Sequence, residues 1–472
     1  MIRGKKFATA AMALALIAAH PAPAPTAGEA FAAEVMALGD ADPAAWAAAH
    51  GLKPDDADAL QVAKALKAAA PLKLLRLEDE GGVIEATMTG RAGSRAFRVV
   101  GVPDRAAPGR LRALFAVPVP TPYPMPATIG AMSEAELTAA LDRRVAFAAE
   151  RDDFSGTVVV RDGDRVVYRR SVGTADRAKG VANGPDTRFN IGSMGKMFTA
   201  VAVMQQIEAG RLTLDTSVGQ VLPEYPNQAG RAVTVRQLLT HQAGLGMLFE
   251  RKGWDRRARY STAASILPAF AAEPLRFAPG SRSAYSNEGF VLLAAMVEKV
   301  SGLPFETYLA QRVFAPAGIS GVFQGGLDET LPGRAVAYRF ADADMLGTGE
   351  RETDPNPMSF GSTGAGGQFA TADEMLRFLG ALHGGKLVGD AGVKALTSPG
   401  GGLRDYGLGF QVIATPTGTL VGHNGGGPHS GVNAEAMSVP ATGWSYAVMG
   451  NYDAPFAQAL GRDVGAFVRA MR

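Results

Sequence analysis

The chain has 472 residues, the length of about three average domains. Hydrophobic residues make up 47% of it and charged residues 19%, which is typical of globular proteins with a large core. The formal net charge of +2 excludes the basic excess of a dedicated nucleic-acid-binding protein. The absence of cysteine excludes disulfides, thiolate metal sites, a cysteine nucleophile and a lipid-modified N-terminal cysteine.

The N-terminal segment has the pattern of a cleavable signal peptide. A basic head precedes an apolar run at residues 7–19 that is too short to span a bilayer. Residues 20–33 are small and Pro-rich, which suits cleavage, although the sequence does not fix the position of the cut. A buried N-terminal helix is the alternative interpretation. We assign residues 1–30 to a signal peptide and expect an exported protein, periplasmic or secreted, with no stable membrane insertion after cleavage.

Residues 31–117 are expected to form a small α+β domain. Two Ala/Leu-rich stretches favour helices, and four short stretches favour the strands of an antiparallel meander. The expected helices are 44–50 and 56–70, and the expected strands are 73–77, 83–89, 96–102 and 111–117. This pattern resembles cystatin-like or NTF2-like domains. No polar cluster in it suggests chemistry, which favours a structural or interaction module.

Alternating prolines in residues 118–126 favour an extended, semi-rigid linker to a larger domain, residues 127–472. That domain begins with a helix and a hairpin, continues with mostly helical segments and ends with strands and a last helix. The expected helices are 132–150, 193–210, 235–239, 289–301, 305–314, 371–383 and 456–471, and the expected strands are 156–162, 165–173, 407–413, 418–423, 431–438 and 445–450. We expect an α+β fold in which the hairpin and the last strands share one central antiparallel sheet, flanked by helices and a helical subdomain.

The helix expected at 193–210 opens with two side chains that suit nucleophilic chemistry. Ser193 and Lys196 are three residues apart and therefore share one face of the helix. A serine hydroxyl becomes a nucleophile when a neighbour takes its proton, and burial lowers the pKa of a lysine towards that task. The pair alone is a weak signal, because a capping serine beside a solvated lysine gives the same pattern.

Two later stretches supply further polar groups. A turn-rich loop before the helix at 289–301 contains Tyr285 and Asn287, a phenol and an amide. The strand at 418–423 ends in His423 followed by Asn424, Gly425, Gly426 and Gly427. Glycines at a strand end allow a substrate to lie against the strand edge and pair with its backbone.

Taken in this order, Ser193-x-x-Lys196, Tyr285-x-Asn287 and His423-x-Gly425 resemble the three motifs of the class C β-lactamase and penicillin-recognising serine hydrolase family. Four accessory stretches also resemble the family; they lie at 212–215, 238–245, 277–280 and 364–373. The resemblance covers roughly residues 127–472. It implies the serine β-lactamase/penicillin-binding fold for that part of the chain.

The resemblance also implies a role for each motif residue. Ser193 is the acylated nucleophile, and Lys196 and Tyr285 share proton transfer, with the formal base left open. The backbone N–H groups of Ser193 and Gly426 form the oxyanion hole. The implied substrate-binding residues are Asn287, His423, Gly425 and Gly426. No metal or cofactor is implied.

The third motif departs from the β-lactamase pattern, which has Lys-Thr-Gly where this chain has His423, Asn424 and Gly425. In antibiotic-cleaving members the lysine helps to hold the substrate carboxylate, and a neutral histidine does so less well. The resemblance therefore favours an esterase or D-aminopeptidase type that cleaves an ester or a small amide or peptide, with no nucleic-acid partner. A D,D-peptidase or β-lactamase is the alternative, and a non-catalytic protein that binds cell-wall fragments is a second. The sequence predicts no oligomeric state.

Four other features have plainer interpretations. The basic run at 251–260 interleaves aromatic residues but is expected to be a solvated loop or lid. His423 and His429 imitate a metal pair, yet no acidic cluster of ligand spacing lies near them. We expect the glycine-rich stretch at 361–367 to form a tight turn and His241 to anchor a loop.

Overall fold

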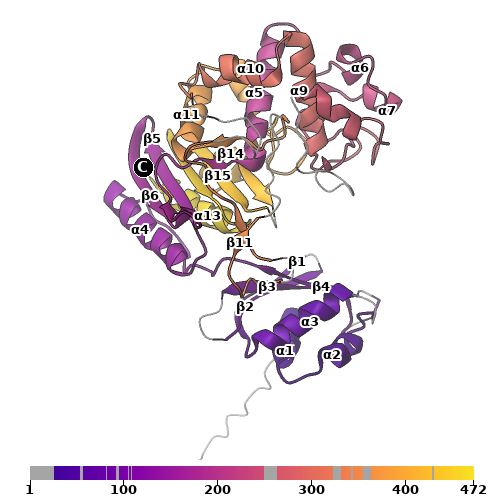
Figure 1. The fold of residues 1–472 in the computed structure, drawn as a ribbon, viewed down its shortest axis with the longest axis vertical. Helices are drawn as coiled ribbons and strands as arrows, with labels where there is room; N and C mark the ends of the chain where they lie inside the picture. The colour runs from indigo at the N-terminus through magenta and orange to yellow at the C-terminus, as the bar shows by residue number, and fades with distance from the viewer. Residues whose placement is uncertain are drawn as a thin grey trace, which may run out of the picture. The chain divides into compact units, whose positions relative to one another are not determined.

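The computed structural model describes residues 26–471 except 54–56, 81, 92–94, 105, 108, 249–262, 321, 323–330, 342–343, 355–362 and 428–429. The basic run, His429 and most of the predicted signal peptide therefore lie outside the described residues. The chain divides into two compact units, Met1–Ala86 with Val99–Phe115 and Thr87–Arg98 with Ala116–Arg472 (Figure 1). Within the described ranges, no helix is long and apolar enough to cross a membrane.

The N-terminal part of the chain has the predicted α+β pattern. It contains α1 (Ala27–Ala37), α2 (Pro43–Ala49), α3 (Ala57–Ala69), β1 (Lys73–Glu80), β2 (Val83–Thr89), β3 (Ala96–Pro103) and β4 (Leu111–Pro118). The strands form one sheet in the order β1-β2-β3-β4, as a meander requires.

Helix α1 differs from the prediction, because it begins inside the segment assigned to the signal peptide, residues 1–30. Thr26 caps it by accepting from the backbone N–H of Glu29, whose carboxylate accepts from the N–H of Thr26 in return. Phe31 and Val35 bury the helix against its own unit. Residues 27–30 therefore belong to the folded module and not to the preceding segment.

The predicted linker packs along the second unit. After β4 ends at Pro118, the residues up to 126 form neither helix nor strand. The backbone N–H of Thr121 donates to a carboxylate oxygen of Asp153 at 2.9 Å, and the ring of Tyr123 lies edge-on to Phe147 at 5.1 Å. The extended conformation that the prolines favour is thus fixed by contacts with the larger unit.

The second unit is built on the predicted central antiparallel sheet. Its strands are β13 (Gln411–Thr415), β14 (Gly418–Gly427), β15 (Val432–Val439), β16 (Trp444–Gly450), β5 (Gly156–Asp162) and β6 (Arg165–Val172), in the order β13-β14-β15-β16-β5-β6. The first hairpin and the last strands therefore share one sheet, which confirms the prediction. Strand β13 begins later than expected, because residues 407–410 form a turn.

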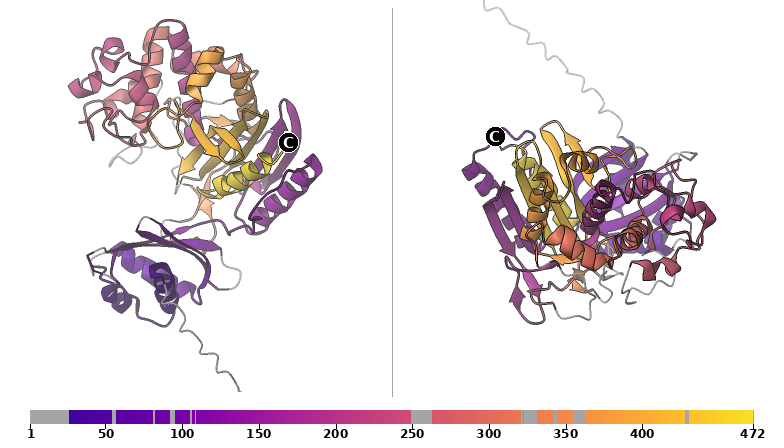
Figure 2. Two further views of the ribbon diagram at one scale, coloured as in Figure 1. Left: turned by 180° about the vertical axis from the view of Figure 1, so that it is seen from behind. Right: turned by 90° about the horizontal axis from the view of Figure 1, so that it is seen from above.

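Helices cover both faces of this sheet (Figure 2). Val158 and Val160 of β5 pack with α4 (Glu134–Glu150) and α13 (Phe456–Val468), whereas Val159 belongs to the core of the opposite face. Successive side chains of a strand point to opposite faces, so the apolar run Val158–Val160 of β5 fills both cores. The opposite core is formed with α5 (Gly195–Glu208), α9 (Asn287–Ser301) and α11 (Ala372–His383).

Short elements complete the helical subdomain and the links to the sheet. The helices are α6 (Val218–Val221), α7 (Gln228–Arg231), α8 (Val235–Leu239), α10 (Phe305–Leu309) and α12 (Asp390–Leu396), with 3-10 or π-helical turns at Gly192–Met194, Ala264–Ala269 and Ala310–Phe314. The short strands are β7 (Thr174–Asp176), β8 (Val181–Ala182), β9 (Phe189–Asn190), β10 (Tyr338–Arg339), β11 (Glu352–Thr353) and β12 (Phe369–Ala370). Most of these were not predicted, because elements of two to four residues carry no readable periodicity.

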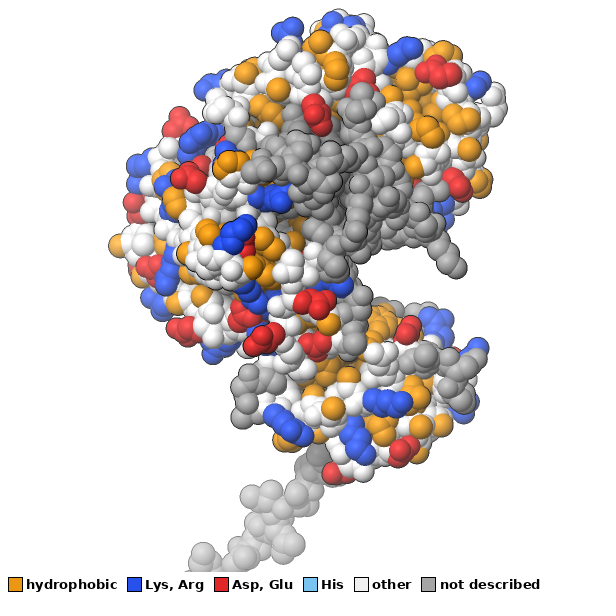
Figure 3. Space-filling view, in the orientation of Figure 1, with side chains coloured by type: hydrophobic (Ala, Val, Ile, Leu, Met, Phe, Trp, Pro, Cys, Tyr) orange, Lys and Arg blue, Asp and Glu red, His pale blue; other side chains and the backbone are white. Residues whose placement is uncertain are grey.

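Charged side chains of both signs are scattered over the described surface (Figure 3). The face shown carries no continuous field of lysine and arginine across its described residues. This distribution agrees with the small net charge of +2.

Candidate active site

Ser193 lies on a short 3-10 turn, η1 (Gly192–Met194), and not inside the predicted helix, which begins at Gly195 as α5. Strand β9 leads into this turn and pairs with β12, and the pairing continues with the N–H of Ile191 donating to Gln368 O at 2.9 Å. The N–H of Gly192 donates to Asn190 Oδ1 at 2.8 Å. The nucleophile candidate is therefore carried by backbone that is tied to a second strand.

Glycines allow other backbone segments to approach this turn closely. A Cβ on Gly425 would lie 1.9 Å from Ile191 O and 3.0 Å from the backbone N of Ser193. A Cβ on Gly366 would lie 2.0 Å from Gly192 O, and Gly366 has a φ of 128°, which L-residues rarely adopt. A side chain at either position would separate the segments that meet at Ser193.

The end of β14 reaches the turn because its neighbour strand stops. The pairing of β13 with β14 ends at Gly422, so the following residues present their edge to η1. A Cβ on Gly192 would lie 2.7 Å from the backbone N of Gly426. The backbone amides of Ser193 and Gly426, the predicted oxyanion-hole pair, thus come from segments in direct contact.

The Lys196 amine is fully buried beside Ser193. Its Nζ lies 3.1 Å from Ser193 Oγ, 2.6 Å from Asn287 Oδ1 and 2.7 Å from the backbone oxygen of Ala365. Burial holds the pKa of Lys196 well below its ordinary value, because the charged form loses its hydration. The amine is therefore suited to a neutral form.

A neutral amine can make the three contacts of Nζ, as an ammonium with three N–H donors can. The neutral amine has two N–H donors and one lone pair. The oxygens of Asn287 and Ala365 accept both donors, which leaves the lone pair for the hydroxyl proton of Ser193. Asn287 opens α9, where Ser286 acts as the N-cap by accepting from Gly289 N–H. The predicted orientation of Lys196 by Asn287 thus has a direct geometric basis.

Tyr285 completes a connected set of three side chains. Lys196 Nζ lies 4.9 Å from the centroid of the Tyr285 ring. A side-chain hydrogen bond joins Tyr285 to Ser193. Burial raises the pKa of Tyr285 above its ordinary value, and the bond to Ser193 opposes that rise only in part. The phenol therefore keeps its proton at neutral pH, so Lys196 is the better placed base and Tyr285 the better placed acid.

The ring of His423, a predicted substrate-binding residue, is enclosed by the protein. The ring is 1% exposed, and its Nδ1–H donates to the backbone oxygen of Asn424. Its Nε2 therefore accepts, and the hydroxyl of Tyr406 donates to it at 3.0 Å. Burial lowers the pKa of His423 to about 3, so the ring is neutral. Both ring nitrogens therefore have partners inside the protein, which holds the side chain of His423 against β14 and Tyr406.

Three contributors to the site carry no signal in the sequence. Tyr406 lies in a glycine-rich stretch and is recognisable only by its bond to His423. Ala365 contributes a backbone oxygen, which any residue possesses. The third contributor is Met247, whose Sδ lies 3.8 Å from the amide nitrogen of Asn287. A methionine in a loop gives no sequence pattern that would mark it. Residues 361–367 were predicted to form a tight turn. Their described part, 363–367, bends beside α5, where the backbone oxygens of Gly364 and Ala365 accept from Thr199 and Lys196.

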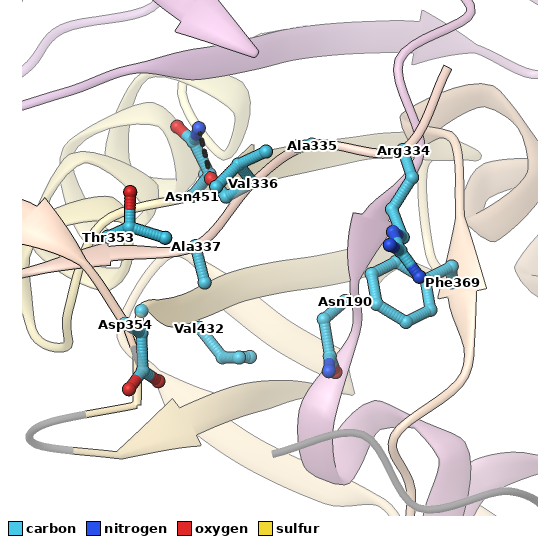
Figure 4. A pocket seen from close by; sticks show the side chains of 12 residues that line it. Asn190, Arg334, Ala335, Val336, Ala337, Thr353, Asp354, Phe369, Val432 and Asn451 are labelled. Carbon is cyan, nitrogen blue, oxygen red and sulfur yellow. Dashed lines mark hydrogen bonds between the residues drawn. The ribbon is translucent and has the colours of Figure 1, made fainter. Parts of the chain in front are cut away.

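A separate pocket lies near this site (Figure 4). Asn190 links the two, since its side chain lines the pocket and its Oδ1 also accepts from Gly192 N–H. Arg334 lies over the ring of Phe369 at 5.9 Å on the same wall. The described lining residues are Asn190, Arg334, Ala335, Val336, Ala337, Thr353, Asp354, Phe369, Gly431, Val432, Gly450 and Asn451. They do not include Ser193, Lys196 or Tyr285, so we locate the chemistry at the Ser193 turn.

Comparison with known proteins yields one family. A family model described as Beta-lactamase matches residues 141–468. The chain is 30% identical to esterase EstB of Burkholderia gladioli over 332 residues, which are 61% of this chain and 82% of that protein. A penicillin-binding protein from Bacillus halodurans has a similar solved structure, with a TM-score of 0.60 and 27% identity over 71% of this chain and 98% of that one.

Another relative is matched over a shorter region. The chain is 34% identical to a D-aminopeptidase of Brucella canis over 169 residues, which are 34% of this chain and 31% of that protein. A D-amino acid amidase from Ochrobactrum anthropi SV3 has the same fold, with a TM-score of 0.58 and 22% identity over 71% of this chain and 97% of that one. The chain spans less than two thirds of the length of several relatives, two of them from Bacillus subtilis.

The close approach at Gly425 predicts a sharp effect of one methyl group. In Gly425→Ala the new Cβ would meet Ile191 O at 1.9 Å and force β14 away from Ser193. We expect the rate at which a fluorophosphonate labels Ser193 to fall about 100-fold, the scale of losing an oxyanion donor. Gly427→Ala is the matched control, because its Cβ would meet no atom within 4 Å. Similar labelling rates for the two variants would contradict the proposed contact.

Proposed function

Because the chain belongs to the Beta-lactamase family, we propose that it is a serine hydrolase that cleaves an ester or a small amide or peptide through an acyl-enzyme on Ser193. The observation that carries the proposal is the buried Lys196 amine, 3.1 Å from the Ser193 hydroxyl. A neutral amine at this distance acts as a general base and turns the hydroxyl into a nucleophile.

The first half-reaction forms the acyl-enzyme. Ser193 Oγ bonds to the carbonyl carbon of the substrate while its proton passes to Lys196 Nζ. The carbonyl oxygen becomes an oxyanion that accepts from the backbone N–H groups of Ser193 and Gly426. Each donor of this kind lowers the barrier by about 3 kcal/mol.

Tyr285 serves the leaving group. As the bond between the carbonyl carbon and the leaving oxygen or nitrogen breaks, the Tyr285 phenol donates its proton to that atom. The proton held by Lys196 then restores the phenol, so the site returns to its starting charge. Water repeats the same steps on the acyl-enzyme and releases the acid, with Ser193 as the leaving group.

An ester is the favoured substrate. The esterase relative is matched over 82% of its length, more than the D-aminopeptidase, which is matched over 31%. The neutral His423 supports the same choice, since it offers no cation to an anionic substrate. D,D-peptidase or β-lactamase activity is the alternative, which the similarity to the penicillin-binding protein from Bacillus halodurans favours. A non-catalytic role in binding cell-wall fragments would require the Ser193 site to be inert.

The protein is further proposed to be exported, periplasmic or secreted. The basic head and the apolar run at residues 7–19 support this proposal. Because Thr26 caps α1, cleavage is expected at or before that residue. N-terminal sequencing of the protein recovered from an expressing bacterium tests this, and recovery from the cytoplasm with Met1 intact would contradict it.

The proposed function predicts a covalent adduct on Ser193. Incubation with a fluorophosphonate is expected to add one phosphonyl group, located on Ser193 by mass spectrometry and absent in Ser193→Ala. We expect hydrolysis of p-nitrophenyl esters with slow or no turnover of nitrocefin, and the reverse preference would favour the β-lactamase alternative. A protein that takes no adduct from a fluorophosphonate or from penicillin would support the non-catalytic alternative.

The assignment of base and acid predicts a pH profile. The pKa of Lys196 is lowered, so kcat/KM is expected to fall only as the pH drops through that lowered value and charges the amine. The pKa of Tyr285 is raised above 10.0, so no alkaline limb from this phenol is expected below pH 10. Lys196→Ala and Tyr285→Phe are each expected to lower turnover at least ~100-fold.

Lys196→Ala and Tyr285→Phe are expected to differ in the pH profile of their residual kcat/KM. Tyr285→Phe keeps Lys196 and should keep the acid limb. If Tyr285→Phe instead lost that limb, the phenol would be the base and the assignment would be reversed.

A further inference from the structure

His241 packs against the phenol ring of Tyr285. The imidazole is 1% exposed and stacks on Tyr285 with the ring centroids 4.4 Å apart and the planes at 29°. Phe290 lies on the imidazole at 5.3 Å and Tyr406 at 4.9 Å. Close-packed rings leave little room for rotation, so His241 restrains the plane of the Tyr285 phenol.

The same residue also holds the backbone on both sides of Tyr285. The N–H of Ala284 donates to the backbone oxygen of His241 at 2.9 Å. The N–H of Ser286 donates to His241 Nδ1 at 3.1 Å. Two amides that flank Tyr285 are therefore bound by one residue, which fixes where the phenol leaves the main chain.

The backbone of His241 itself has an unusual conformation. Its φ is 58°, in the left-handed region that residues other than glycine seldom adopt. Such a conformation persists where surrounding contacts over-determine it. Here those contacts are the stacking of the imidazole on Tyr285 and the two hydrogen bonds from the N–H groups of Ala284 and Ser286.

The imidazole is arranged to hold position and not to move protons. Because Nδ1 accepts from Ser286, the ring proton lies on Nε2, which is buried and has no hydrogen-bond partner among the described residues. Burial and the nearby Lys196 and His423 hold the pKa of His241 well below its ordinary value. A neutral ring with no partner at its remaining N–H has no proton path to a substrate.

We propose that His241 is a positioning residue that holds the Tyr285 phenol where it protonates the leaving group. Tyr406 supports it, since this tyrosine contacts His241 and bonds to His423 of β14. The inference rests on the proposed function and goes beyond it, because it assigns the geometry of one proton transfer to a residue outside the three motifs. His241 contacts neither Ser193 nor the leaving group in this role.

The test uses two esters of one acid that differ in their need for a proton. A p-nitrophenolate leaves without protonation, whereas an alkoxide leaves only with a proton. In His241→Phe the ring stack is kept and the acceptor for Ser286 N–H is lost. The readout is kcat/KM, which reports acylation, because the later release of the acid is the same step for both esters and enters kcat alone. We expect kcat/KM for the alkyl ester to fall about 10- to 100-fold. For the p-nitrophenyl ester we expect kcat/KM to change by less than about threefold.

A second variant keeps the test decisive if the first does not fold. Asparagine tolerates a positive φ, and its Oδ1 replaces Nδ1 as the acceptor, so His241→Asn loses only the ring. We expect the same selective loss on the alkyl ester, but smaller. The double variant of His241→Phe and Tyr285→Phe should be no slower on that ester than Tyr285→Phe alone, since both changes remove one proton transfer.

The control is His383→Phe. His383 is also a partly buried histidine, bonded to Ser438 at 2.8 Å at the end of α11, and it contacts none of the site residues named above. Its variant should leave the ratio of the two esters unchanged. An equal loss on both esters in the His241 variants, or wild-type rates on the alkyl ester, would overturn the positioning role. A wild-type protein that hydrolyses neither ester would contradict the proposed function, and this role with it.

Discussion

The whole site depends on one buried amine. Lys196 has no exposed surface, and its nitrogen contacts an amide oxygen, a backbone oxygen and a hydroxyl. An ammonium in that place would lose its hydration without an acidic partner among the described contacts, whereas a neutral amine satisfies each contact. Most residues of α5 are buried, so the helix carries the amine into the core, where the charged form loses its hydration.

Backbone packing supplies what side chains alone do not. Ser193, the end of β14 and the turn at Gly366 come within contact because the positions that separate them lack a Cβ. A strand edge freed at Gly422 then lies beside the nucleophile and offers backbone groups to a substrate. The predicted oxyanion hole thus depends on glycines, because the absence of a Cβ lets the backbone segments lie in contact.

The groups around the amine are uncharged. His423 is neutral and occupied by Tyr406 and its own backbone, and His241 is neutral and packed on Tyr285. Additional cations beside a buried amine would lower its pKa further, and an exposed cation would attract anionic substrates. With neutral histidines around it, Lys196 remains the base and the Tyr285 phenol stays protonated. These neutral surroundings agree with the proposed neutral ester substrate.

The sequence by itself determined what depends on near neighbours in the chain. Strand alternation and helix periodicity are local, so the β5–β6 hairpin and α11 were predicted, and Ser193 and Lys196 share a turn of the chain. Only the tertiary structure decided protonation and contact, because burial and hydrogen bonding join residues far apart in sequence. Burial sets the state of Lys196, while the oxygens of Asn287 and Ala365 hold its amine in place. Tyr406, distant in sequence, bonds to the ring of His423.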